Sequence, residues 1–450
     1  MKKPPANQSA QWSSKWAFIL AATGAAVGLG NIWRFPYLMG NHGGSGFLFL
    51  YLLFLCLLGL PILTAELLIG REARTNAIDA MSQLAVRHQR SRHWRVVSLL
   101  GAVALLLILS FYSVVSGWSI AYLYHALSVG FHGQGPSQIQ QTWQQLIASP
   151  GQLLIWHSVF MLLTIGVILL GVQKGLERAT KIMMPALYII LTLLVFIAIH
   201  IGQLKPALHY LFDFHRDNIT MHTAASALGQ AFFTLAVGAG AMLTYGAYAP
   251  KDVPIPFSVG VIAVLGVIVA LLAGLAIFPL VFQFHLTAQA GPSLMFITLP
   301  TAFAHIPGGN LVAALFFLLL LFAAWTSSIN LAEPLVYALI DKCRLSRTVA
   351  AWVVGLAAWA LGIGSLLSFN LWQHLTFFNH TLFELNANIA TNVILPVGGL
   401  GYALFAGWVL PKRVTQQQVR SAVYPFWRFV TRYIVPIGIL YVLFYGMLSK

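Results

Sequence analysis

The chain has 450 residues, of which 59% are hydrophobic and only 8% are charged, with a formal net charge of +15. Soluble globular domains do not have this balance, whereas runs of about 20 apolar residues are typical of membrane-spanning helices, which satisfy their own backbone hydrogen bonds. The Lys and Arg residues are spread over several loops and not gathered in one patch, which argues against a nucleic-acid partner. The composition therefore predicts an all-α protein embedded in a lipid bilayer.

Apolar runs separated by polar or charged breaks predict eleven spans. In chain order they cover residues 14–38, 45–70, 96–127, 152–171, 179–201, 226–248, 257–284, 309–340, 348–368, 381–410 and 425–448. A polar tail, residues 1–13, precedes the first span and has no small-residue cleavage site, so we expect it to be retained. The longest loops, 71–95 and 128–151, are too short for a soluble domain, and one membrane domain is predicted to fill residues 1–450.

Basic residues mark the loops on one side of the membrane. They are Arg71, Arg74, Arg87, Arg90, Arg92 and Arg95 after the second span, Lys174, Arg178 and Lys181 after the fourth, Lys342, Arg344 and Arg347 after the eighth, and Lys412, Arg413 and Arg420 after the tenth. The loops after the third, seventh and ninth spans contain no Lys or Arg. Because Lys-rich and Arg-rich loops stay in the cytoplasm, the N-terminus is predicted to be cytoplasmic and, with eleven spans, the C-terminus external.

Two spans are interrupted by small residues. The first contains VGLGN at 27–31, and the sixth, five spans later, contains VGAGAMLTYG at 237–246. An unwound helix exposes amides that can bind a carboxylate and carbonyls that suit a hard cation such as sodium. Close helix packing is the alternative explanation of one such motif. Two motifs five spans apart favour two inverted five-span repeats, 14–201 and 226–410, followed by an extra helix at 425–448.

Longer motifs resemble those of the neurotransmitter:sodium symporter family, whose bacterial members include the leucine transporter. They are VGLGN followed by WRFP, PxxxxExxxGR from Pro61 to Arg71, QAFFTLAVGAGAMLTYGAY, AGLAIFP, GPSLMFITLP, and TSSI followed by DKCRLSR. The resemblance covers nearly the whole chain. It implies the leucine-transporter fold, in a bacterial inner (plasma) membrane, and import of amino acids with sodium by alternating access. An enzyme is not predicted, because the sequence shows no nucleophile–base motif and no phosphate-binding loop.

The resemblance implies two sodium sites. The first would use the carbonyls of Gly24, Val27 and Ala323 and the hydroxyls of Thr326 and Ser327. The second would use the Ala26 carbonyl, the side chains of Asn31 and Thr234, the substrate carboxylate and a polar side chain at the position of Gly266. Glycine has no such side chain, and Ala270 replaces a Glu or Ser that handles proton or chloride compensation in relatives. One sodium site is therefore expected, while a second sodium ion and chloride or proton coupling remain open.

The resemblance also implies a substrate pocket. It would be lined by Ala25, Ala26, Gly28, Gly30, Ile108, Tyr112, Phe233, Thr234, Ala236, Ala239, Ser327 and Leu331. Gly28 stands where carriers of monoamines have an Asp, which favours an amino acid whose carboxylate meets the half-helix amides, the sodium ion and the Tyr112 hydroxyl. Ala236 and Ala239 are smaller than the Ser and Phe of the leucine carrier, so a bulky hydrophobic or aromatic amino acid is predicted.

Gate residues show matches and departures. The outer gate would use Arg34 and Phe233, with Glu384 or Asn388 in place of an Asp that is Ala387 here. The inner gate would use Trp12 and Asp341, with Lys2, Lys3 or Lys15 in place of an Arg that is Ser9 here. Glu66 and Glu333 are ionisable residues within spans and hence functional candidates, and Glu66 is expected to support the unwound part of the sixth span.

Two other functions fit the same fold. A substrate sensor would bind without uptake, and a proton-driven permease would respond to a pH gradient instead of a sodium gradient. The altered second sodium site and the altered gates suit the sensor. The sequence does not determine which amino acid is bound, the sodium stoichiometry or the oligomeric state.

Overall fold

The computed structural model describes residues 11–215, 218–287, 291–419 and 422–448. In this part of the chain the structure is mostly helical, as predicted, and its one sheet is a small hairpin of β1 (Thr376–Phe377) and β2 (His380–Thr381). Nine of the eleven predicted spans fall on continuous helical segments whose ends differ by a few residues, and the first and sixth predicted spans are each interrupted. The apolar runs therefore locate the long helices correctly, because helix formation in a bilayer depends on local hydrophobicity.

The helices have the following bounds. The first ten are α1 (Lys15–Ala26), α2 (Phe35–Asn41), α3 (Ser45–Phe54), α4 (Leu60–Ala73), α5 (Ala77–Arg87), α6 (Arg95–Ser128), α7 (Pro136–Ala148), α8 (Pro150–Leu169), α9 (Arg178–Ile201) and α10 (Leu204–Phe212). The others are α11 (Met221–Leu235), α12 (Ala241–Tyr248), α13 (Ile255–Gln283), α14 (Leu299–Ala304), α15 (Gly309–Cys343), α16 (Arg347–Leu367), α17 (Leu382–Asn388), α18 (Leu395–Leu404), α19 (Lys412–Gln418), α20 (Tyr424–Phe429) and α21 (Val435–Leu448). Short π-helical turns extend several of them, at Gly30–Arg34, Leu55–Gly59, Val172–Glu177, Leu294–Thr298, Ile389–Ile394, Phe405–Val409 and Val430–Ile434.

Eight helices of the described residues are long and apolar enough to cross a membrane. A ninth span is counted when Lys15–Ala26 and Gly30–Asn41, which meet at an angle of 61°, are taken together. These lengths and compositions make the chain a multi-pass membrane protein.

The two longest predicted loops are not simple loops, because 71–95 contains α5 and 128–151 contains α7. Helix α7 begins with a proline at its first turn and buries Ile139, Trp143 and Leu146, which lie on one face, while glutamines occupy the other face. Such short amphipathic helices contain no long apolar run, because polar residues occur in every turn. A search for apolar runs therefore does not detect them.

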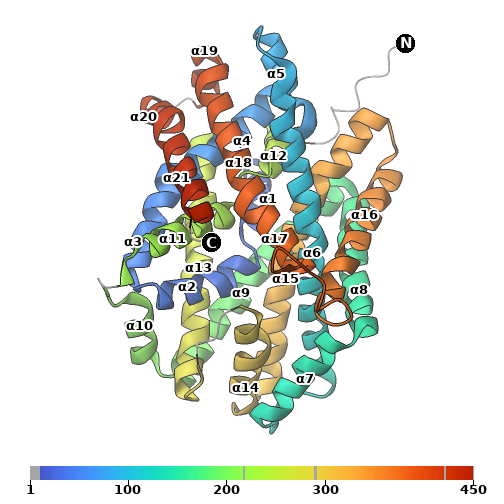
Figure 1. Cartoon of the computed structure of the whole chain (residues 1–450), viewed down its shortest axis with the longest axis vertical. Helices are drawn as coiled ribbons and strands as arrows, with labels where there is room; N and C mark the ends of the chain where they lie inside the picture. The colour runs from blue at the N-terminus through green and yellow to red at the C-terminus, as the bar shows by residue number, and fades with distance from the viewer. Residues whose placement is uncertain (1–10, 216–217, 288–290, 420–421, 449–450) are drawn as a thin grey trace.

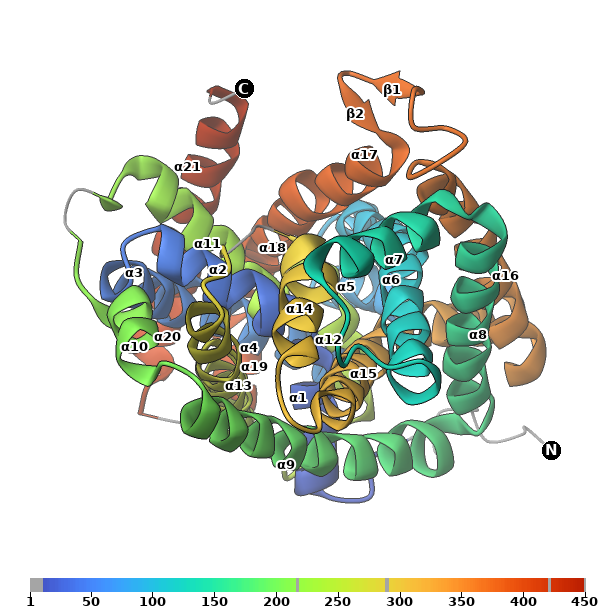
Figure 2. The ribbon, with the colours of Figure 1, turned by 90° about the horizontal axis from the view of Figure 1, so that it is seen from below.

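Helix α15 lies at the centre of the molecule and packs along α6. In its most apolar stretch 78% of the residues are buried, compared with 39% for α8. Figure 2 shows α8, α9 and α16 along the outside. Large apolar side chains on these outer helices are exposed, for example Ile155 on α8 and Phe196 on α9. This distribution is expected when lipid, not water, surrounds the outer helices.

Both glycine-rich segments interrupt helices. Helix α1 ends where Val27 adopts an extended backbone (φ −85°, ψ 101°), and helical structure resumes near Gly30. Helix α11 ends at Ala236, which has a left-handed backbone (φ 50°), and Gly238 follows with φ 98°. A Cβ atom on Gly238 would lie 2.1 Å from the Leu395 carbonyl oxygen, so only glycine fits there.

The basic loops lie at one end of the molecule. Arg95 and Lys342, which come from different loops, both pair with Asp79 on α5, at 3.3 and 3.2 Å. The Ser13 amide, near the first described residue, donates to the Glu177 carboxylate at 2.9 Å. Figure 1 shows α5 and α19 at this end and α7, α10 and α14 at the opposite end.

Candidate functional site

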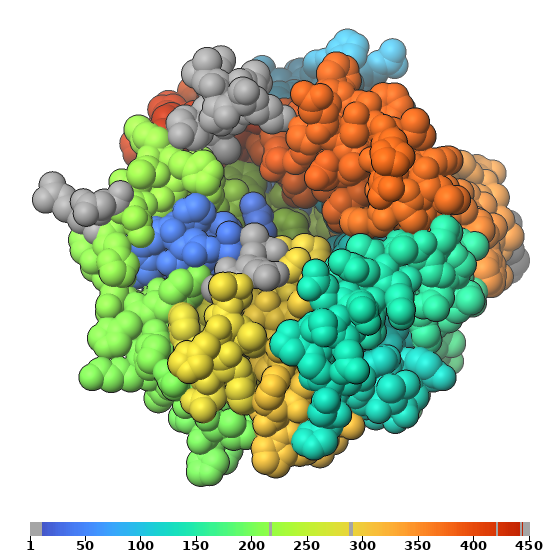
Figure 3. All heavy atoms as spheres, turned by 60° about the horizontal axis from the view of Figure 1, so that its bottom comes forward, coloured from blue at the N-terminus to red at the C-terminus, as the bar shows by residue number. Residues whose placement is uncertain are grey.

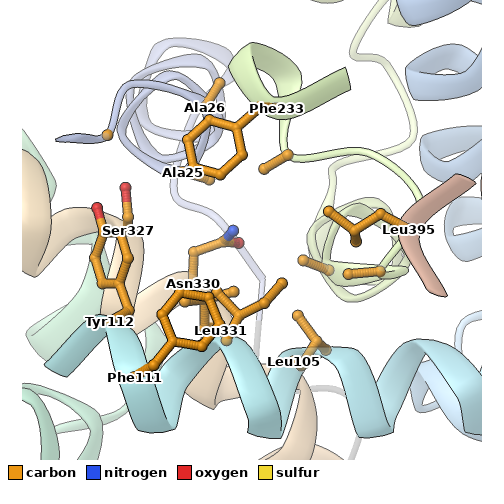
Figure 4. Close-up of a pocket in the computed structure, with 15 residues that line it drawn as sticks. Ala25, Ala26, Leu105, Phe111, Tyr112, Phe233, Ser327, Asn330, Leu331 and Leu395 are labelled. Atoms are coloured by element: carbon orange, nitrogen blue, oxygen red, sulfur yellow. The ribbon is translucent and has the colours of Figure 1, made fainter. Parts of the chain in front are cut away.

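An interior cavity lies beside both helix interruptions (Figure 4). Its lining comes from α1 and the residues after it, α6, α11, α12 and the segment between them, α15 and α18. It consists of Ala25, Ala26, Gly28, Leu105, Ile108, Phe111, Tyr112, Phe233, Ala236, Ala239, Ala241, Ser327, Asn330, Leu331 and Leu395. The cavity volume is about 70 Å³. Most lining side chains are apolar, so the cavity suits a small molecule with a large hydrophobic group and few polar groups.

Figure 3 shows the face at the end opposite the basic loops, and that face is hollowed near its centre.

All the predicted pocket residues except Gly30 and Thr234 line the interior cavity. Gly30 is covered by Phe233, because a Cβ atom on Gly30 would lie 2.0 Å from a carbon of that ring. The Thr234 hydroxyl instead accepts hydrogen bonds from Tyr51 at 3.2 Å and from Gln230 at 3.4 Å.

One end of the cavity is polar. The Leu29 amide, in the gap after α1, donates a hydrogen bond to the Tyr112 hydroxyl at 3.3 Å. A Cβ atom on Gly28 would lie 3.0 Å from both the Tyr112 hydroxyl and the Ser327 Oγ. These polar groups therefore converge on Gly28, and a larger side chain at Gly28 would have to displace them.

Oxygen atoms converge where α1 meets α15, as the first predicted sodium site requires. The Ser327 hydroxyl donates to the carbonyl oxygens of Gly24 at 3.4 Å and Val27 at 3.3 Å. The Thr326 hydroxyl donates within its own helix, to the carbonyl oxygens of Phe322 at 3.0 Å and Ala323 at 3.2 Å. Two oxygen ligands about 2.4 Å from a cation, at a right angle to each other, are about 3.4 Å apart. The separations of the Ser327 hydroxyl from the two carbonyl oxygens match this value and also match ordinary hydrogen bonds, so a monovalent ion at these neutral oxygens stays a prediction.

The second predicted sodium site has fewer oxygens. The Asn31 side chain donates to the Ala26 carbonyl at 3.4 Å. A Cβ atom on Gly266 would lie 3.6 Å from the Thr234 methyl and 3.9 Å from the Asn31 Nδ2 atom. Gly266 is thus beside the predicted ligands, but it contributes no side-chain oxygen, and nearby in the chain Ala270 is fully buried without one.

Comparison with known proteins identifies the family. The model of the sodium:neurotransmitter symporter family matches residues 9–134 and 131–450. The chain belongs to this family. It is therefore a sodium-dependent membrane transporter and not an enzyme, which confirms both predictions.

Individual relatives agree with this assignment. The sodium-dependent transporter YhdH of Bacillus subtilis is 37% identical over 438 residues, which cover 96% of each chain. A sodium-dependent transporter of Haemophilus influenzae is 31% identical and covers 96% of this chain and 97% of the relative. The sodium-dependent dopamine transporter of Bos taurus is 25% identical over 96% of this chain and 68% of its own length. Among solved structures, MhsT in complex with L-phenylalanine matches with a TM-score of 0.89 and 38% identity, over 96% of this chain and 99% of MhsT.

The predicted outer gate residues are only partly brought together in the transporter. The Arg34 guanidinium carbon lies 5.7 Å from the centre of the Phe233 ring, a cation–π distance. Glu384 caps its own helix, since its carboxylate accepts from the Thr381 amide at 2.9 Å, and Asn388 bonds to a neighbour on its own helix. No ion pair joins Arg34 to Glu384 in the part of the chain that the structure describes.

The inner gate residues lie at the end that carries the basic loops. Trp12 is buried, and its indole N–H donates to the Tyr245 carbonyl at 3.4 Å. Asp341 accepts hydrogen bonds from Asn76 at 2.6 Å and from Thr75 at 3.2 Å. Trp12 thus connects the residues before α1 to α12, and Asp341 connects α15 to the α4–α5 turn, at the end that carries the basic loops.

The tail cation predicted beside the inner gate is not found at Lys15. The Lys15 ammonium lies 3.8 Å from the centre of the Phe257 ring, where it makes a cation–π contact. The other two predicted replacements, Lys2 and Lys3, lie outside the described residues, as does Ser9, which stands in the place of the Arg.

Two buried glutamates have distinct partners. Glu66 is fully buried, and its carboxylate accepts a hydrogen bond at 2.6 Å from the amide of Gly238, in the gap between α11 and α12. The sequence predicted that Glu66 supports this segment, and the hydrogen bond to Gly238 is consistent with that role. Glu333 is also fully buried but pairs with Arg347 and accepts from the Tyr248 hydroxyl at 3.0 Å.

Several residues that line the cavity were not predicted from the sequence. They are Leu105, Phe111, Ala241, Asn330 and Leu395. Three of them follow from helical spacing, because Leu105 and Phe111 lie three residues on either side of Ile108 on α6, and Asn330 lies three residues after Ser327 on α15. Leu395 is the first residue of α18, far from the other lining residues in the sequence. Its position at the cavity depends on the close packing of its backbone against Gly238.

Proposed function

We propose that the transporter is a sodium-coupled symporter that imports hydrophobic amino acids, including aromatic ones, by alternating access. The observation that carries this proposal is the position of Ser327. Its side chain lines the cavity, and its Oγ also lies 3.3 Å from the Val27 carbonyl in the candidate sodium site. Because one side chain borders both sites, an ion and a substrate bound there would stabilise the same arrangement, which couples their binding.

The substrate would lie along the cavity. Its carboxylate would meet the polar end, near Gly28 and the Tyr112 hydroxyl, with the sodium ion close by. Its side chain would extend toward Leu105, Ala239 and Leu395. The similar protein MhsT forms a complex with L-phenylalanine, which supports a hydrophobic amino acid as the substrate class.

The ion requirement would rest on the first sodium site. The oxygens of Gly24, Val27, Ala323, Thr326 and Ser327 form that site in this proposal. The second site, at Ala26, Asn31 and Thr234, lacks an oxygen at Gly266 and would bind sodium weakly without substrate. No chloride requirement is proposed, because Ala270 has no hydroxyl to offer.

The proposed architecture has eleven spans in one membrane domain. Spans one and six would be the interrupted pairs α1–α2 and α11–α12, and the inverted repeats would cover 14–201 and 226–410 before an extra helix at 425–448. The basic loops at one end favour a cytoplasmic N-terminus and an external C-terminus in a bacterial-type plasma membrane. Transport would then rock spans 1, 2, 6 and 7 against spans 3, 4, 8 and 9.

Sodium dependence of binding tests the proposal first. We expect purified protein to bind labelled tryptophan and leucine in sodium chloride and equally in sodium gluconate, and at least about tenfold more weakly in potassium chloride. The measurement is scintillation-proximity binding at equal ionic strength. Equal affinity in potassium chloride would contradict sodium coupling and favour a proton-driven permease.

Uptake into proteoliposomes separates a symporter from a sensor. A sodium gradient is expected to drive accumulation of tryptophan, whereas a pH gradient alone is not. Sodium-dependent binding without uptake would identify the protein as a sensor and would contradict the proposed transport.

Pocket size tests the substrate class. Ala239 lines the cavity and is almost fully buried, so the variant Ala239→Phe would fill space that a large substrate needs. We expect tryptophan affinity to fall at least about tenfold because of overpacking, and leucine affinity to change less than about threefold. Sodium-dependent Kd values for both ligands are the measurement, and leucine serves as the control for folding. An equal fall for both ligands would contradict the predicted placement of the substrate side chain.

A further inference from the structure

One polar atom of the cavity lining has no partner. Asn330 lies on α15, three residues after Ser327, and its side chain is 1% exposed. Its Oδ1 atom is buried and accepts no hydrogen bond within the described part of the chain. A buried acceptor without a partner is unfavourable because it has lost its hydrogen bonds to water, so a ligand that donates a hydrogen bond there would gain affinity.

The neighbours of Asn330 in the cavity are apolar. Leu331 follows it on α15, and Leu105 and Phe111 face the cavity from α6. Figure 4 shows the Asn330 carboxamide pointing into the cavity, with Tyr112 and Ser327 on one side and Leu395 on the other. The unpaired oxygen therefore lies between the polar end of the cavity, where the substrate carboxylate is proposed, and its apolar end.

We propose that Asn330 recognises the side chain of the substrate through a hydrogen bond, and this inference rests on the proposed function. Its Oδ1 atom accepts a hydrogen bond from a donor on an otherwise hydrophobic side chain. The indole of tryptophan fits best, because it has one N–H donor, no acceptor and a large apolar body. A phenol hydroxyl would also donate, but its own acceptor lone pairs would face apolar side chains.

This contact changes what the cavity selects. A purely apolar cavity separates ligands mainly by size. A cavity with a buried acceptor also disfavours a ligand of equal size that lacks the donor, because the acceptor then stays unpaired. Asn330 is thus a specificity-determining residue for an indole side chain.

The experiment compares tryptophan with its benzothiophene analogue, in which a sulfur atom replaces the indole N–H and the shape is nearly kept. We expect the unmodified protein to bind tryptophan at least about tenfold more tightly than the analogue in sodium chloride. The variant Asn330→Leu, which keeps the side-chain size, is expected to bind both equally. Leucine has no side-chain donor, so its affinity is expected to change less than about threefold in this variant.

Each outcome decides the inference. Equal affinity of the unmodified protein for tryptophan and the analogue would overturn it, while sodium-dependent leucine binding would leave the proposed function intact. Loss of leucine and tryptophan binding to the same extent in properly folded Asn330→Leu would also overturn it, because Asn330 would then contact a part shared by both ligands. If that variant does not fold, the affinities of the unmodified protein for tryptophan and the analogue still test the inference. Failure of the unmodified protein to bind any amino acid with sodium would refute the proposed function itself.

Discussion

Replacing Thr326 by valine is expected to abolish the sodium dependence of substrate binding. Valine keeps the shape of the side chain but removes the hydroxyl, which lies 3.2 Å from the Ala323 carbonyl oxygen. The opposite wall of the site is close, since a Cβ atom on Gly24 would lie 3.2 Å from the Thr326 Cβ atom. Loss of one of five neutral ligands should weaken tryptophan and leucine binding in sodium at least about tenfold. A sodium titration of labelled-ligand binding is the measurement.

Ser328→Ala is the matched control. Ser328 is also buried on α15, but its hydroxyl lies 2.8 Å from Thr164 on α8, away from the α1 interface. This variant is expected to keep the sodium dependence of the unmodified protein. If Thr326→Val binds substrate with an unchanged sodium titration, the ion is not held at this site, and the coupling through Ser327 is wrong.

Replacing Arg347 by methionine is expected to lower the free energy of unfolding by about 3–5 kcal/mol. Glu333 is fully buried, and Arg347 is its only cationic partner among the described residues. The Tyr248 hydroxyl, at 3.0 Å, would then be the remaining hydrogen-bond donor to a carboxylate without a counter-charge. Thermal and denaturant unfolding of the purified protein in detergent are the measurements.

Two further variants test the cause of this loss. The double variant Glu333→Gln with Arg347→Met removes both charges and is expected to recover most of the stability. Arg95→Met breaks an exposed ion pair with Asp79, which retains Lys342 as a second cationic partner. The free energy of unfolding is therefore expected to fall by less than about 1 kcal/mol. A double variant as unstable as Arg347→Met alone would show that the buried charge is not the cause.

The location of the long helices could be predicted from the sequence. The third predicted span, 96–127, is α6 (Arg95–Ser128), and the eighth, 309–340, is α15 (Gly309–Cys343). Both agree closely because a backbone in lipid must form helix wherever a long apolar run occurs. The helix interruption after α1 was predicted from VGLGN for a similar local reason, since glycines permit the backbone to leave the helix.

The contact of Ser327 with Gly24 and Val27, in contrast, could not be predicted from the local sequence. These residues are about 300 positions apart in the sequence, and only the resemblance to a known family indicated that they meet. Periodicity places Ser327 on a helix face, but no local rule states which other helix that face contacts.

The sequence by itself determined the membrane class and the positions of the long helices, and its motifs pointed to the family, whose resemblance implied most of the cavity residues. Only the tertiary structure decided that Glu384 caps its own helix, that Thr234 bonds to Tyr51 and Gln230 outside the cavity lining, and that the Asn330 oxygen has no partner among the residues described. The physical reason is that hydrophobicity acts through the local chain, residue by residue. Hydrogen bonds and ion pairs depend on distances of a few tenths of an ångström between residues that come together only when all the helices have packed.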